Sequence, residues 1–315
     1  MIKTVLCDML NIKYPVFQGG MAWIANAELA AAVSNAGGLG ILAAGNAPAE
    51  YVLEEIRKVK TLTDKPFGVN IMPLSPYAEA VAQVVADEKV KLIVTGAGNP
   101  SKYMKMWLDS GATVIPVVPS TAMAKLMERC GASAVIAEGG EAGGHVGDIT
   151  TMTLVPQVCD VVKIPVIAAG GIADGRGIAA ALMLGACGVQ VGTRFLAAAE
   201  CTVHQNYKNM ILKAKDIDTI STGKRLGHPV RAIKNPFVRE YSAKEYDSTI
   251  SNDELEAFGA GRLRLAAVEG DVKNGCILAG QVSGMVNKEQ PAKEMIEEMF
   301  TEAEMLLKGV GKWVN

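Results

Sequence analysis

The sequence predicts an α/β fold, a (β/α)8 TIM barrel with a smaller cap or lid segment. Half of its 315 residues are hydrophobic and a fifth are charged, which is enough for a large buried core. Short apolar runs recur eight times within about the first 200 residues, and helical patterns separate them. The runs are continuously apolar, which is typical of parallel strands buried on both faces. A doubly wound sheet is the alternative, but such sheets more often stop at about five or six strands.

The expected strands and helices alternate along the first part of the chain. Proline near the first turn and glycine after the last turn mark several of the helices. The strands are expected to begin near Pro15, Gly40, Phe67, Leu92, Val114, Ala134, Pro165 and Gly188. The helices are expected at 26–36, 48–60, 76–87, 100–110, 121–129, 154–161 and 177–184.

The pattern changes after Arg194, and this change divides the chain into three parts. Residues 1–199 are expected to form the barrel. Residues 200–270 carry more charge and are expected to form a cap or lid over the barrel mouth. Residues 271–315 are expected to return to the site through the small-residue stretch 275–285 and then to pack a helix, 289–307, on the barrel exterior.

Composition excludes several classes of protein. The net charge of −2 gives no general basic field for binding nucleic acid. No run of about 18 apolar residues predicts a membrane span, and the N-terminus does not resemble a signal peptide. The six cysteines are scattered without metal-ligand spacing, so no metal site is predicted. Cysteines of this kind favour a reducing compartment, and we expect a cytoplasmic protein.

One glycine-rich stretch, 137–147, follows the sixth expected strand and contains a single histidine, His145. Five of its eleven residues are glycine, which lets the backbone approach a ligand closely. In a barrel of this kind, function lies at the C-terminal ends of the strands, where this stretch falls. The alternative is a glycine-rich turn with an incidental surface histidine.

The residues at the ends of the seventh and eighth expected strands indicate a phosphate-binding site. Gly170-Gly171 and Gly192-Thr193 offer exposed backbone N–H groups where barrels commonly bind phosphate. Glycine needed only for close packing of strand and helix is the alternative. Together with the amides of Gln18 and Asn70 and the flexible turn at 20–21, the pattern suggests FMN.

Three motifs resemble the nitronate monooxygenase (2-nitropropane dioxygenase-like) flavoproteins: 137–147, 170–175 and 192–195. Within that superfamily, 18–23, 95–103 and 228–235 look closer to the FMN-dependent enoyl-acyl-carrier-protein reductase II. The likeness covers nearly the whole chain. The loop reads Ala-Glu-Gly at 137–139, where the monooxygenases usually have Ala-Gln-Gly. This departure favours the reductase.

The resemblance implies reduction of trans-2-enoyl-acyl-carrier-protein by NADH or NADPH through FMN, in fatty-acid elongation. It also implies an acyl carrier protein as partner and activation by a monovalent cation. His145 is then the catalytic residue, as proton donor or as the group that stabilises the thioester oxygen, and Glu138 helps to hold the loop or the flavin. The expected cofactor-binding residues are Gly20, Met21, Ala22, Asn46, Asn70, Glu138, Gly143, Gly170, Gly171, Gly192, Thr193, Gln281 and Ser283.

Several alternatives stay open at this stage. The chain could be a nitronate monooxygenase that uses oxygen, or a non-catalytic barrel that senses flavin or phosphate. Arg231, Lys234 and Arg239 form a basic run that is either a solvated face or a docking site for the acidic carrier protein. The preference for NADH or NADPH, the acyl-chain length and the oligomeric state, a homodimer among the options, cannot be read from the sequence.

Overall fold

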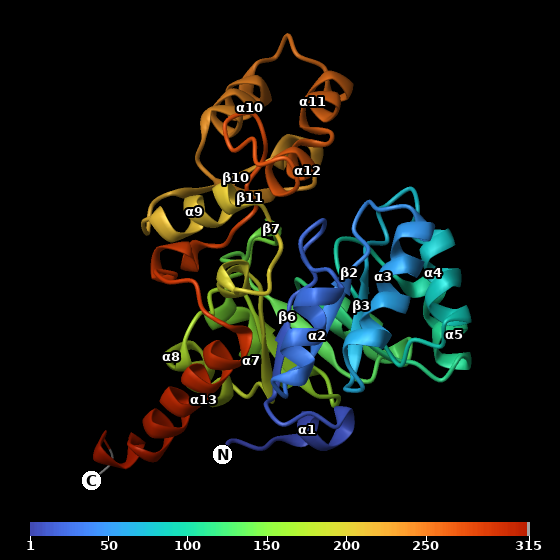
Figure 1. Cartoon of the computed structure of the whole chain (residues 1–315), viewed down its shortest axis with the longest axis vertical. Helices are drawn as coiled ribbons and strands as arrows, with labels where there is room; N and C mark the ends of the chain where they lie inside the picture. The colour runs from blue at the N-terminus through green and yellow to red at the C-terminus, as the bar shows by residue number, and fades with distance from the viewer. Residues whose placement is uncertain (314–315) are drawn as a thin grey trace.

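The computed structural model of the chain describes residues 1–313 and contains a barrel of eight parallel strands (Figure 1). The strands follow the order β1-β9-β8-β6-β5-β4-β3-β2 around the barrel. Each begins within one residue of its predicted start, so the predicted fold class is confirmed. The strands are β1 (Val16–Gln18), β2 (Gly40–Ala43), β3 (Phe67–Ile71), β4 (Leu92–Thr95), β5 (Thr113–Val118), β6 (Val135–Glu138), β8 (Val166–Ala169) and β9 (Gly188–Val191).

The barrel closes between β1 and β2 through Leu39 and the side chain of Gln18. The backbone N–H of Leu39 donates to the carbonyl of Val16 at 2.8 Å, and Leu39 accepts from Gln18 at 2.9 Å. The fully buried amide of Gln18 accepts from the N–H of Ile41 at 3.2 Å and donates to its carbonyl at 3.3 Å. Gln18 therefore joins two strands and is not available for ring recognition.

All seven predicted helices are present on the outside of the barrel. Asn26, Ser120 and Asp174 accept N–H groups at the starts of α2, α6 and α8, as helix capping requires. The helices are α2 (Ala27–Asn35), α3 (Ala49–Leu62), α4 (Ala78–Asp87), α5 (Ser101–Asp109), α6 (Thr121–Arg129), α7 (Thr151–Val161) and α8 (Gly175–Met183).

One short helix at the N-terminus, α1 (Val5–Leu10), was not predicted. Its buried Leu6 and Leu10 pack with the inward-facing side chains of Phe17 and Ile41 in a single cluster. The helix thus fills the N-terminal end of the barrel, opposite the rim where the site is expected.

The long helix near the C-terminus, α13 (Ala292–Lys308), completes the ring of barrel helices. It contacts α8 and α2, which flank the place of the eighth helix in such a barrel. The carboxylate of Glu302 accepts from the first N–H of α8, at Gly175, at 2.7 Å. The first 199 residues thus hold all eight barrel strands but only seven of the surrounding helices. The last two residues of the predicted 271–315 segment, 314–315, lie outside the described residues.

The cap is inserted between β9 and α13. Its strands β10 and β11 form an antiparallel sheet with β7. This strand belongs to the glycine-rich stretch 137–147, here called the histidine loop. Phe237, Tyr241 and Phe258 pack together as a small aromatic core of the cap. The elements are β7 (Gly144–His145), α9 (Gln205–Lys213), β10 (Thr219–Thr222), β11 (Val230–Ile233), α10 (Pro236–Tyr246), α11 (Asn252–Gly259) and α12 (Arg262–Ala267), with 3-10 helices at Thr193–Ala197, Lys224–Leu226, Gln281–Met285 and Val310–Trp313.

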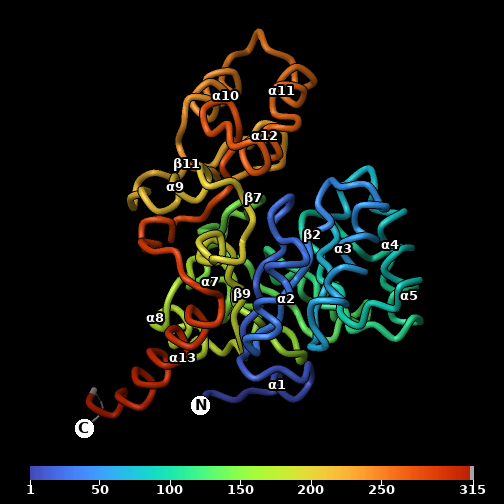
Figure 2. The backbone as a smooth tube through the Cα atoms, viewed as in Figure 1, coloured from blue at the N-terminus to red at the C-terminus, as the bar shows by residue number. Residues whose placement is uncertain are grey.

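The chain leaves the barrel and returns to it at one place, as Figure 2 shows. The N–H of Ala199 donates to the carbonyl of Gln290 at 3.0 Å, and the N–H of Gln290 donates to Ala197 at 3.2 Å. The buried guanidinium of Arg194 donates to the side chain of Gln290 at 2.7 Å. The two connections of the cap are therefore bound to each other. Within residues 1–313, no helix is long and apolar enough to cross a membrane.

Candidate active site

Side chains along each strand point alternately into and out of the barrel. The last inward-facing side chains form the floor of a cavity at the C-terminal end of the barrel. Phe17, Ile115 and Ile136 point into the apolar barrel interior, where they pack in one cluster. Side chains two residues further along each strand point the same way, one layer higher. In this upper layer the chain places glycine, alanine, valine and three polar side chains: Gly19, Ala43, Asn70, Gly96, Val117, Glu138, Ala169 and Gln190.

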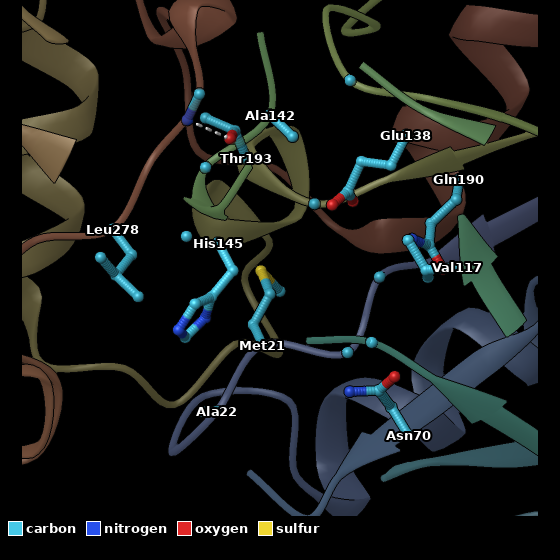
Figure 3. Close-up of a pocket in the computed structure, with 18 of the residues that line it drawn as sticks. Met21, Ala22, Asn70, Val117, Glu138, Ala142, His145, Gln190, Thr193 and Leu278 are labelled. Atoms are coloured by element: carbon cyan, nitrogen blue, oxygen red, sulfur yellow. Dashed lines mark hydrogen bonds between the residues drawn. The ribbon is translucent and has the colours of Figure 1, made fainter. Parts of the chain in front are cut away.

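The cavity above this layer opens to solvent, and its empty space, open solvent included, is about 1180 Å³. Asn70, Val117, Glu138 and Gln190 line it from the floor, and His145 lines it from the loop above β6 (Figure 3). Eleven of the fourteen predicted site residues line this one cavity: Gly20, Met21, Ala22, Asn70, Glu138, Gly143, His145, Gly170, Gly171, Gly192 and Thr193.

Three predicted residues lie outside the cavity lining. Asn46 is exposed, because the chain turns away at Gly45, which lines the cavity with a φ of 51°. The side chain of Gln281 is exposed as well. Ser283 is fully buried and its hydroxyl donates to the carbonyl of Gly280 at 2.7 Å. These last two residues shape the wall through the 3-10 turn that they form.

The histidine loop is fixed at its base by Glu141. The carboxylate of Glu141 accepts from the backbone N–H of Thr151 at 3.0 Å and from its hydroxyl at 2.9 Å, and so satisfies the start of α7. This bond places the first residue of α7 at Thr151, three residues before its predicted start. Glu141 is therefore committed to the loop, although it lines the cavity.

The cap and the return segment fix the loop from above. His145 pairs with Val230 of β11, and the N–H of Val146 donates to the carbonyl of Pro229 at 3.0 Å. A Cβ atom on Gly143 would lie 2.6 Å from the backbone of Ala279, so only glycine lets the return segment cross here. Figure 3 shows the neighbouring bond, in which Thr193 accepts from the N–H of Gly280 at 2.9 Å.

The imidazole of His145 makes no hydrogen bond or ion pair within residues 1–313, so both nitrogens are available to a ligand. Its side chain is accessible from the open cavity, yet protein atoms surround it. This desolvation lowers the pKa of His145, and the charge of nearby His228 lowers it further. At neutral pH, His145 is therefore a neutral imidazole with one N–H donor.

Glu138 and Gln190 are the unsatisfied polar groups of the floor. Burial raises the pKa of Glu138 to about 7, and its carboxyl group has no partner within the described part of the chain. The Oε1 atom of Gln190 is buried without a hydrogen bond in the same part. Buried polar atoms are normally paired, so the unpaired Oε1 of Gln190 indicates a bound molecule with a complementary donor. The carboxyl group of half-buried Glu138 faces the same cavity and offers that molecule a second polar contact.

A second set of free groups lies on backbone amides. Within residues 1–313, the N–H groups of Gly170, Gly171 and Gly192 have no hydrogen-bond acceptor. Gly170 and Gly171 have φ values of 88° and 70°, which turn the backbone sharply where β8 ends. Free amides of this kind bind phosphate oxygens. Amides for a phosphate and polar groups for a ring fit the predicted FMN.

Other cavity residues were not predicted, and a few of them come from the cap side. Leu263, Leu278 and Val282 add apolar wall. Arg264, next to Leu263, lies 5.7 Å from the ring centre of Trp23, which has an uncommon φ of 64°. Leu278 and Val282 lie in the stretch 275–285 that was expected to return to the site. Nothing local in the sequence indicates that Leu263 reaches the rim.

The predicted basic run does not form one exposed face. Arg231 is half-buried, and its guanidinium donates to the carbonyl of Gly140 at 3.1 Å and to Thr219 at 3.3 Å. Burial lowers the pKa of Arg231. Lys234 and Arg239 are exposed. Arg231 is thus part of the support of the histidine loop.

The family model described as nitronate monooxygenase matches residues 3–81 and 76–302. The structure of FabK from Thermotoga maritima has a TM-score of 0.97, with 45% sequence identity and coverage of 100% of both chains. A dehydrogenase of a hydroxy-methyl-oxo-octahydroindene carboxyl-CoA from Mycobacterium tuberculosis is 34% identical over 96% of each chain.

A probable nitronate monooxygenase from Staphylococcus haemolyticus is 37% identical and covers 78% of this chain and 81% of its own length. The family model spans almost the whole chain, and full-length relatives exceed 30% identity. This chain belongs to the nitronate monooxygenase family, whose oxidoreductases depend in general on FMN.

Proposed function

We propose that the chain is an FMN-dependent enoyl-thioester reductase. Its substrate would be a trans-2-enoyl group on acyl carrier protein, and its reductant NADH or NADPH. The observation that carries the proposal is the full-length likeness to FabK at 45% identity, an enoyl-ACP reductase II. The cavity supports it with a single imidazole that faces a polar floor and an apolar wall suited to an acyl chain.

A bound FMN would supply the ring that accepts hydride from the nicotinamide and passes it to the β-carbon of the substrate. Gly170, Gly171 and Gly192 would hold its phosphate, and Asn70, Glu138 and Gln190 its ring. Negative charge develops on the thioester oxygen as the β-carbon accepts hydride. A donor placed at that oxygen lowers the barrier. His145 in its neutral form provides such an N–H, and we assign it this role in preference to proton transfer.

Replacement of His145 by alanine tests this role. Loss of one donor to a developing oxyanion lowers kcat by about 100- to 1,000-fold. Flavin binding should remain near the wild-type level, because the loop is held by Glu141 and β11 rather than by the imidazole. His145→Gln, which keeps an N–H donor, is the control and should retain more activity. Wild-type turnover by His145→Ala with FMN bound would exclude the role.

A second candidate, oxidation of alkyl nitronates with oxygen, is favoured by the family model and by the staphylococcal relative. Anaerobic consumption of NADH that depends on a crotonyl thioester supports the reductase. Oxygen uptake with a nitroalkane anion, without that consumption, supports the monooxygenase. A yellow protein with neither activity would instead be a binding protein.

A further inference from the structure

Glu138 and Gln190 lie at one level of the barrel, on either side of Ala169. The strand register pairs Glu138 with Ala169, and it pairs Ala169 with Gln190. Neighbouring strands lie about 4.8 Å apart. Because the residue between them carries only a methyl group, the two longer side chains share the space above Ala169. Figure 3 shows both at the same side of the cavity.

Neither side chain is satisfied by the protein. Within residues 1–313 the carboxyl group of Glu138 has no hydrogen bond or ion pair, and Oε1 of Gln190 is buried without a donor. Protein atoms surround the half-buried side chain of Glu138, and desolvation of a carboxylate that has no partner raises its pKa, so the group holds its proton to a higher pH. A protonated carboxyl group offers one donor and one acceptor.

We propose that Glu138 binds the flavin ring as an uncharged carboxylic acid, donating its proton to a ring acceptor beside Gln190, so that loss of this proton weakens flavin binding. The inference rests on the proposed function, because it requires a flavin. The protonation state of Glu138 then controls how tightly the flavin binds.

The surroundings of Glu138 support this state. The neighbouring strands β5 and β8 carry no ionisable side chain, and neither does β9. In the cavity, the carboxylate of Glu141 is directed to Thr151, and His145 belongs to the loop above. Burial alone raises the pKa of Glu138 to about 7. The helices packed on β6 carry the remaining ionisable groups, none of which contributes to the shift: Lys125, Glu128, Arg129, Cys159 and Asp160.

The test is the affinity for flavin as a function of pH. Apoprotein is titrated with riboflavin between pH 6 and pH 9, and fluorescence quenching gives Kd. Riboflavin is used beside FMN because the phosphate of FMN itself titrates near pH 6. If only the protonated form binds, Kd of the wild type rises on the order of a hundredfold across this range.

Two variants separate Glu138 from general charge effects. Glu138→Gln keeps a donor and an acceptor at every pH, so its Kd should stay constant. Asp148→Asn removes an exposed carboxylate from the same loop and should follow the wild type.

The outcomes divide clearly. A wild-type Kd that does not change with pH, or a Glu138→Gln variant that keeps the wild-type dependence, overturns the inference and leaves the proposed function standing. Wild-type protein that binds no flavin at any pH overturns both. If Glu138→Gln does not fold, infrared difference spectra of the wild type at pH 6 decide instead. A carboxylic-acid carbonyl band that persists and shifts on riboflavin binding supports the inference, and its disappearance overturns it.

Discussion

His145 lies in β7, and His228 lies two residues before β11, the strand that pairs with β7. The two imidazoles are close enough for their positive charges to repel. This repulsion adds to burial and lowers the pKa of His145. The neutral form of His145 therefore persists to a lower pH than for an ordinary histidine. If catalysis needs the neutral N–H donor, activity falls only as the pH drops below this lowered pKa.

Substitution of His228 by glutamine should shift the pH at which activity falls on the acid side of the pH profile, its acid limb. Without the neighbouring charge, the pKa of His145 rises, so activity is lost at a higher pH than in the wild type. The measurement is kcat against pH with a small enoyl thioester, and the fall of activity at low pH should begin at a higher pH than in the wild type. His204→Gln is the control, because His204 caps α9 outside the cavity lining. An acid limb that stays in place or moves to lower pH contradicts the argument.

Single residues differ in how far the sequence could predict them. Gln190 was missed, although alternation along Gly188–Val191 puts it in the same inward layer as Glu138. Asn46 lies outside the cavity lining, because the sequence gives the end of a strand but not the direction of the turn that follows. Ser283 also lies outside it, and its hydroxyl satisfies its own turn, which no sequence spacing reveals.

Among the elements, the pairing of β7 with β11 has the largest effect on the site. It connects the histidine loop of the barrel to the cap, and Arg231 strengthens it through the carbonyl of Gly140. The two strands are far apart in the sequence, and β7 has only two residues. Its periodicity is too short to be recognised, so this contact could not be predicted from the sequence.

Arg231→Met should loosen the loop while leaving the barrel folded. One hydrogen bond of this kind contributes about 0.5–1.5 kcal/mol. We therefore expect kcat/KM for a small thioester to fall by up to about tenfold, with faster hydrogen exchange at 139–147. Arg239→Met removes an exposed charge of the same run and should change neither. Equal losses in both variants would indicate that activity depends on the positive charge of the basic run and not on the hydrogen bond from Arg231 to the loop.

The fold of the whole barrel depends on α13, a helix that follows the cap in the sequence. The apolar face of α13 buries Met295, Ile296, Met299 and Phe300 against the barrel. The strands and seven helices were predictable because each carries its own local pattern. The packing of this helix on the barrel exterior was predicted as well, but its place between α8 and α2 was not, since a helix pattern identifies an apolar face but not the groove that covers it.

A chain that ends before Pro291 should therefore fail to fold. Each of the four large side chains contributes about 1.5–3 kcal/mol when buried. Their sum is comparable to the whole stability of a typical domain, about 5–15 kcal/mol. Soluble yield and thermal melting measure the loss. A chain that ends after Gly309 keeps the entire helix and should melt like the wild type, and a cooperative transition in the shorter chain would refute the ring-completing role of α13.

The hydrogen bonds between Ala199 and Gln290 make the cap an insertion whose two ends are already neighbours. Such an insertion can be exchanged as a cassette, since a short linker across this junction would leave every strand and helix of the ring in the chain. What departs with the cassette is β11, the strand that aligns His145. The barrel scaffold and the alignment of His145 are thus separable units, so new substrates can be sought by grafting caps onto an unchanged barrel.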